Sequence, residues 1–309
     1  MNRFKNIIFL ADRENDMQVA LERAVALART NEARLTVMDV TPDVTEADHF
    51  LETHGIDINR QLRDNRLEAL EEMTRPYTHK GIAIYTKVLT GITFMEVIRA
   101  VQRNHYDLVM KVAEHIAGFS VTLFGSTDLH LLRKCPCPVW IDQENAATGY
   151  KRLLAAVDPF DDESGNLQRL ILDLATSLAA REQAAVDVVH AWQMPGESML
   201  RNGRGRIPEN ELKQLLRERK SRHLHGLDAL LADYELNSEM ENVHLVKGKP
   251  EQVIYDLATR QQADLIIMGT LGRAGIPGLI IGNTAEDVLQ KTRTAVLAVK
   301  PAGFTSPVV

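Results

Sequence analysis

Short apolar runs alternate with longer stretches of helical periodicity along the whole chain. In its second half the apolar runs are 153–157, 184–191, 243–246, 264–268 and 295–299. The stretches that repeat apolar residues at helical spacing are 163–180, 208–235, 250–261 and 283–292. Continuous apolar strands that alternate with helices are typical of a parallel sheet covered on both faces. The pattern therefore predicts an α/β fold.

The same pattern occurs twice, each time beginning with a basic residue, an apolar run and an aspartate. The matched segments are 4–12 with 150–158, 106–110 with 263–268, and 137–141 with 294–298. A repeat of this kind predicts two tandem α/β domains, each a doubly wound, five-stranded parallel sheet of Rossmann-like type. Their expected bounds are 1–145 and 150–303, with a short polar hinge between them.

The strongest candidate for chemistry is a glycine-rich segment after the fourth apolar run of the second copy. Gly269 and Gly272 bracket a tight turn. Nine residues separate Gly272 from Gly282, which precedes a predicted helix. Ligands bind at the carboxyl ends of strands in open α/β sheets, and a helix N-terminus attracts anions. Glycines let the main chain approach a phosphate closely. Ordinary turn and capping glycines are the alternative, but Asp158 at the end of the first strand favours a nucleotide site.

This segment resembles the Gly-2x-Gly-9x-Gly-Ser/Thr motif of ATP-binding universal stress proteins, and the whole chain resembles the tandem members of that family. The resemblance implies the family's adenine nucleotide alpha hydrolase-like fold in each half. It implies a cytoplasmic stress-response protein that gives resistance to stress such as DNA damage and acts by binding, not by catalysis. It also implies ATP or a related adenine nucleotide in the C-terminal domain, with magnesium as a compatible companion.

Individual roles follow from the same resemblance. The implied base and ribose contacts are Ala156, Val157, Asp158 and Ala191. The implied phosphate contacts are Met268, Gly269, Leu271, Gly272, Gly282, Asn283 and Thr284. Asn283 stands where the family has Ser or Thr, and its amide can still donate to a phosphate oxygen. The last strands, 139–142 and 296–300, are implied to pair as an internal pseudo-dimer, and further association into a homodimer stays open.

The corresponding segment of the first copy differs. We align Met110 with Met268, so that Lys111 replaces Gly269, Glu114 replaces Gly272 and one extra residue precedes Gly125. A carboxylate at a phosphate position opposes anion binding, so we expect a degenerate loop that does not bind ATP in the family's way. A structural role and a pocket for a different ligand both stay open. The segment 44–63 fits either a cover over such a pocket or a loop that leads into a helix.

The composition limits the classes of partner that we expect the protein to bind. The 309 residues carry a formal net charge of -6, which argues against direct nucleic-acid binding. No apolar run approaches the ~20 residues that a membrane span needs. The first residues lack the features of a signal peptide, so we expect a cytoplasmic protein without a membrane partner.

Other reactive residues carry weaker hypotheses. Cys135 and Cys137 flank a proline at the start of a predicted strand, and because successive side chains of a strand point to opposite faces, we expect the two thiols not to share a metal. His223 and His225 lie two apart on a predicted helix and face different ways. The basic residues around 201–222 form either a solvated helix face or a lid over a polyphosphate.

The sequence shows no nucleophile elbow, Walker lysine loop or metal-binding histidine pair, so we expect no enzyme. Two alternatives remain. One is a nucleotide hydrolase or transferase. The other is a nucleotide-independent carrier or scaffold that uses the N-terminal pocket.

Overall fold

The computed structural model describes residues 3–13, 16–78, 82–114, 124–144, 148–161, 166–203, 205–270 and 282–309, with only the backbone of Asp48 and Asn283. The first half of the chain forms β1 (Asn6–Leu10), α1 (Gln18–Asn31), β2 (Arg34–Thr41), α2 (Ala47–His54), α3 (Ile58–Thr78), β3 (Ile84–Thr90), α4 (Thr93–Asn104), β4 (Leu108–Val112), α5 (Ser126–Lys134) and β5 (Val139–Asp142). The second half forms β6 (Arg152–Ala156), α6 (Leu167–Glu182), β7 (Ala185–Trp192), α7 (Glu197–Asn202), α8 (Glu209–Leu231), β8 (Val243–Lys247), α9 (Pro250–Gln261), β9 (Leu265–Gly269), α10 (Asn283–Lys291) and β10 (Ala295–Val299).

All ten of these strands belong to one sheet, in the order β3-β2-β1-β4-β5-β10-β9-β6-β7-β8. Neighbouring strands within each half run parallel, whereas β5 and β10 meet antiparallel with Leu297 opposite Trp140. Each half therefore has the doubly wound strand order expected of its alternating pattern. The predicted α/β fold class is confirmed.

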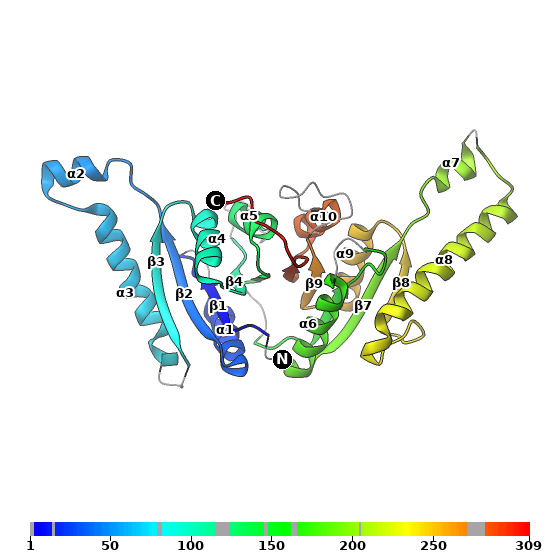
Figure 1. The fold of residues 1–309 in the computed structure, drawn as a ribbon, viewed down its shortest axis with the longest axis horizontal. Coiled ribbons are helices and arrows are strands. Elements are labelled where there is room, and N and C mark those ends of the chain that lie inside the picture. Colours follow the sequence, from blue (N-terminus) through cyan, green and yellow to red (C-terminus); the bar gives the residue numbers. More distant parts are fainter. Residues whose placement is uncertain are drawn as a thin grey trace.

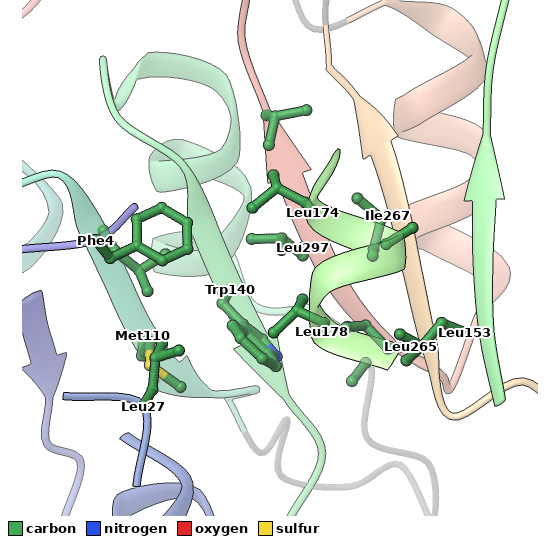
Figure 2. Packing of buried hydrophobic residues seen from close by; sticks show 14 of the residues in the cluster. Phe4, Leu27, Met110, Trp140, Leu153, Leu174, Leu178, Leu265, Ile267 and Leu297 are labelled. Carbon is green, nitrogen blue, oxygen red and sulfur yellow. The ribbon is translucent and has the colours of Figure 1, made fainter. Parts of the chain in front are cut away.

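Helices cover both faces of the sheet (Figure 1). One apolar layer joins the sheet to α1, α3, α6 and α8, and the other joins it to α4, α5, α9 and α10. Figure 2 shows the first layer where the halves meet, with Trp140 of β5 and Leu297 of β10 near Leu178 of α6. Because this layer includes residues of both halves, the two halves share one hydrophobic core.

A buried polar network also ties the halves together at the junction. The Trp140 Nε1–H donates to the Tyr150 hydroxyl at 3.1 Å, and that hydroxyl donates to Asp142 Oδ1 at 3.2 Å. Arg23 pairs with the other oxygen of Asp142 and lies 4.0 Å above the Tyr150 ring. Burial raises the pKa of Tyr150 to about 12, so the phenol stays a neutral donor.

The long helices α3 and α8 extend outward at the two ends of the sheet, with α2 and α7 near their tips (Figure 1). The sequence of segment 44–63 fits either a cover over a pocket or a loop that leads into a helix. In the structure this segment forms α2 and the start of α3. Within the described part of the chain, every helix is too short or too polar to cross a lipid bilayer.

Candidate functional site

The carboxyl ends of β6, β7 and β9 lie side by side at one edge of the sheet. Ala156 is opposite Met268 on one side and Val189 on the other. Ala156 and Met268 belong to the apolar layer that faces α9 and α10, and Ala191 packs against that layer. The structure thus brings three of the predicted contacts to one face of the sheet.

Asp158 follows β6 and shapes a turn. Its backbone N–H donates to Gln168 Oε1 at 2.8 Å, and its Oδ1 accepts the Phe160 N–H at 3.2 Å. Val157 has a different orientation, because its side chain lies in the opposite apolar layer and its N–H donates to the Val189 carbonyl at 3.0 Å. Asp158 is therefore placed at the strand end as predicted, while the Val157 side chain points to the other face.

The two ends of the glycine-rich segment meet. Thr270 directly follows β9, and its carbonyl accepts the Gly282 N–H at 2.7 Å, which sets the start of α10 beside the end of β9. Thr284 lies in the first turn of α10, where backbone N–H groups have no acceptor within the helix. Leu271, Gly272 and the side chain of Asn283 lie outside the described residues.

Of two further details at this point, the second fits an anionic ligand. A Cβ on Gly269 would meet only Leu167 Cδ2, at 2.9 Å, so the position is close to an apolar side chain on the far face of the sheet and does not itself indicate an anion. The Thr270 Oγ1 is buried and has no hydrogen-bond partner among the described residues. The helix dipole of α10 adds positive potential. The residues present therefore fit a phosphate group.

A magnesium ion would need few protein ligands here, because Mg²⁺ is commonly held by one or two carboxylates, water and the phosphates themselves. Asp158 supplies one carboxylate. Within the described ranges no group of three His, Cys, Asp or Glu side chains is placed to hold a metal ion.

The strand registers correct the alignment of the two copies. Asp107 accepts the N–H groups of Lys5 and Asn6, and Asp264 accepts those of Lys151 and Arg152, so the two aspartates are equivalent. Counting from them, Lys111 matches Met268 and Val112 matches Gly269; Glu114 matches Leu271. The expected match of Lys111 with Gly269 and of Glu114 with Gly272 is wrong by one position.

The expected extra residue is absent as well. Ala113 precedes Gly125 by the same twelve positions that separate Thr270 from Gly282. The backbone agrees, because the N–H groups of Ala113 and Thr270 donate to equivalent carbonyls, those of Asp142 and Val299. The two loops therefore have equal length, and their difference lies in their side chains.

In the first half, protein carboxylates bind the backbone N–H groups at this position. Asp128 Oδ2 accepts the N–H groups of Glu114 and Gly125, both at 2.9 Å. Glu114 Oε2 accepts the Thr127 N–H at 3.1 Å. Lys111 pairs with the other oxygen of Asp128, and both side chains are buried. We call Lys111, Glu114 and Asp128 the internal anion cluster.

The internal anion cluster explains why Gly125 is a glycine. A Cβ at this position would overlap the Glu114 side chain. The glycine therefore allows the close approach of a carboxylate that belongs to the chain. In the second half the positions of Lys111 and Asp128 are held by Met268 and Ala285, which carry no charge.

A cleft of about 270 Å³ lies beside the internal anion cluster, at the ends of β1, β2 and β4. Its lining includes Asp12, Asp39, Thr93, Glu114 and Thr127. Leu10 and Val40, which also line it, stand where the second half has Ala156 and Ala191. The side chains at these two positions are larger than the alanines of the second half.

In each half, a side chain of the second strand contacts a side chain of the long helix. Asp39 of β2 pairs with Arg66 of α3. The register makes His190 of β7 the counterpart of Asp39. His190 Nε2 lies 2.8 Å from His223 Nδ1 of α8.

The Val157 carbonyl decides which ring nitrogen of His190 carries a proton. His190 Nδ1 lies 3.1 Å from the Val157 carbonyl, which only accepts, so Nδ1 donates; in a neutral His190 ring, Nε2 then accepts from His223. The Phe160 and Trp192 rings pack against His223. Sequence reasoning missed this pair because the two histidines are 33 positions apart.

The basic residues around 201–222, for which a solvated helix face and a lid were both expected, make contacts within the protein where the structure describes them. Arg201 pairs with Glu197 and Glu209, at 3.1 Å in each case. Arg219 donates to the Gln193 carbonyl at 2.6 Å. Arg201 therefore links α7 to α8, and Arg219 links α8 to the segment after β7, whereas Arg204 lies outside the described residues.

The chain matches the model of the universal stress protein family twice, over residues 3–142 and 149–300. Universal stress protein E of Escherichia coli strain K12 is 30% identical over 320 residues, with 100% of this chain and 98% of that protein covered. The universal stress protein E homolog of Haemophilus influenzae is 26% identical over 312 residues, with coverage of 97% and 98%.

Two solved structures share the architecture of the whole chain. A protein of Pseudomonas aeruginosa PAO1 has a TM-score of 0.75 at 21% identity, with 97% of this chain and 94% of that chain covered. A universal stress protein of Archaeoglobus fulgidus has a TM-score of 0.65 at 18% identity, with coverage of 96% and 98%. At these identities the likeness shows the fold.

Proposed function

The chain belongs to the universal stress protein family, and from this premise we propose that its C-terminal half binds ATP or a related adenine nucleotide. The observation that carries the proposal is the hydrogen bond from Gly282 to the Thr270 carbonyl, which sets the α10 N-terminus beside the end of β9. A phosphate there would meet free helix N–H groups and the positive end of the helix dipole. Ala156 and Ala191, which have small side chains, are the proposed contacts of the base above the neighbouring strands.

The proposed difference in function between the two halves follows from the charged side chains at equivalent positions of their loops. The second half offers uncharged Met268 and Ala285 where the first half has the internal anion cluster. A phosphate in the first half would meet the Glu114 and Asp128 carboxylates at the N–H groups it needs. We therefore assign nucleotide binding to the domain 150–303 and a degenerate loop to the domain 1–145, with the two paired through β5 and β10 as an internal pseudo-dimer.

The protein would act as a binding protein in the response to stress such as DNA damage. Asp158, with Gly269, Gly272, Gly282, Asn283 and Thr284, forms the proposed ribose and phosphate contacts. Titration calorimetry of the full-length chain with ATP and magnesium tests this proposal. We expect one site for each chain and weaker binding of adenosine, which lacks the phosphates. Absence of heat with ATP, or equal affinity for adenosine, would contradict the phosphate assignment.

Hydrolysis is the alternative within the same site. Incubation with ATP and magnesium distinguishes the two, because a binding protein releases no more than trace ADP. Sustained turnover would favour a hydrolase or transferase.

The cleft of about 270 Å³ supports a second candidate function, which is binding of a different ligand in the first half. Its lining carries both carboxylates and basic groups, including Asp12, Arg13 and Lys111. Such a lining favours a polar, weakly charged ligand over a polyphosphate. Native mass spectrometry of the purified chain tests this candidate, since a co-purified ligand would raise the mass.

A further inference from the structure

The two cysteines of the chain lie together, against the expectation from the sequence. Cys135 follows α5, the chain bends at Pro136 and Cys137, and β5 begins only at Val139. The bend places the two Sγ atoms 3.5 Å apart in the same apolar layer. The expectation that strand alternation separates the two thiols is wrong, because residues two positions apart point to the same face of a strand.

A buried lysine from the other half lies beside them. Continuing the β5–β10 register by two positions sets Lys300 opposite Cys137. The Lys300 Nζ donates to the Leu132 carbonyl at 2.7 Å and lies 5.1 Å from the Phe304 ring centroid. Burial lowers the pKa of Lys300 to about 8, and the two neighbouring thiols oppose that shift. A cation is thus held in apolar surroundings next to two sulfur atoms.

The two thiols differ in their environment. Burial opposes a thiolate at Cys135, but a hydrogen bond from Cys137 and the positive charge of Lys300 outweigh it and lower the pKa of Cys135. Burial raises the pKa of Cys137 well above its ordinary value, and the adjacent Cys135 raises it further. Cys135 is therefore the better nucleophile and Cys137 the proton-bearing partner.

We propose that Cys135 and Cys137 form a reversible disulfide when the protein meets a hydroperoxide, and that Lys300 is a positioning residue for this chemistry. The Cys135 sulfur attacks one peroxide oxygen, the O–O bond breaks, and the leaving oxygen takes a proton and departs as water or alcohol. The Cys137 sulfur then attacks the resulting sulfenic sulfur. The S–O bond breaks, and hydroxide leaves with the Cys137 proton as a second water.

The electrons balance in this sequence, since two thiols lose two electrons and the peroxide is reduced by two. A dithiol reductant reverses it by thiol–disulfide exchange. The geometric change is small, because the sulfur atoms need to close from 3.5 Å to about 2.05 Å. The site would sense hydroperoxide at the contact between the two halves, since the thiols come from the first and Lys300 from the second.

The direct test treats the full-length protein with hydrogen peroxide, alkylates the remaining thiols and measures the intact mass. The chain holds two cysteines, so the count of alkyl groups reports on this pair alone. We expect a monomer that is two hydrogen atoms lighter and takes up no alkyl group, and that recovers both groups after dithiothreitol. Two alkylated thiols after treatment, or conversion only to sulfonic acid, would overturn the proposal.

Two variants test the roles. Cys137→Ser should stop at a sulfenic acid that reacts with dimedone; a variant that still loses its thiol without a dimedone adduct would contradict the assignment. Lys300→Met replaces the side chain by an uncharged one of similar length and should slow thiol oxidation about tenfold, because without the cation a smaller fraction of the thiol is ionised. Lys291→Met, outside the cluster, is the matched control. An equal rate for Lys300→Met and the control would overturn the role of Lys300, and the wild-type mass measurement stands even if a variant does not fold.

Discussion

The Glu114 carboxylate accepts a hydrogen bond from the Thr127 backbone N–H, 3.1 Å away in the first turn of α5. The chain thereby places its own negative charge where the equivalent helix of the second half would meet a phosphate. Asp128 binds two more N–H groups of the same loop. The asymmetry between the halves thus rests on carboxylates that occupy an anion position, in addition to missing glycines.

Replacing Glu114 should lower the free energy of unfolding, and the loss should be larger when the acceptor of the Thr127 N–H is removed altogether. Glu114→Ala removes the partner of the Thr127 N–H, and losses of this kind at a helix N-terminus are about 0.5–2 kcal/mol. Glu114→Gln keeps an oxygen in the same place and should cost less. Urea denaturation of the three proteins measures the difference. Equal stability of Glu114→Ala and wild type would contradict a stabilising role for this contact.

The histidine pair should hold α8 to the sheet. His223→Ala removes the contact to the buried His190 Nε2, for which we expect a loss of about 1–3 kcal/mol in the free energy of unfolding. His225 provides the matched control, because it is exposed on the same helix and hydrogen-bonds with Ser221 of that helix. His225→Ala should change stability by less than about 0.5 kcal/mol. Similar losses in both variants would count against the pair.

Tyr150 should make stability depend on alkaline pH. Its folded-state pKa is raised by burial to about 12 from 10.0, so its contribution is complete below pH 10 and is lost as the pH rises through 12. At about pH 8, Tyr150→Phe should be less stable than wild type by about 1–3 kcal/mol, through the lost contacts to Trp140 and Asp142. At about pH 11 the gap should narrow. A gap that is constant across this range would show that the phenol does not titrate as inferred.

Apolar periodicity was sufficient to predict the fold, because buried parallel strands need continuous apolar runs whatever the details of their loops. Local chemistry was harder to predict. The Cys135–Cys137 contact lies in a bend before β5, and the alternation argument failed because residues two positions apart share a face of a strand. The His190–His223 contact depends on how α8 crosses β7.

The alignment of the two copies failed for a similar reason. Matching Met110 with Met268 follows residue identity, whereas the strand register follows the hydrogen bonds of Asp107 and Asp264 to the first strands. Sequence similarity between diverged copies is weak evidence at a single position. The backbone contacts decide it, and they show that Lys111 and Asp128 replace Met268 and Ala285 as a buried pair.

The central claim is that the C-terminal half binds nucleotide because its loop lacks the carboxylates that fill the first. Titration of ATP into the double variant Met268→Lys, Ala285→Asp tests this most directly, since it transfers the buried ion pair of the first half. Met268→Leu with Ala285→Ser changes the same positions without charge and is the control. We predict ATP affinity at least about tenfold lower in the charged variant than in the control, the cost of losing one or more charge-assisted hydrogen bonds. Equal affinity in a folded charged variant would contradict the account.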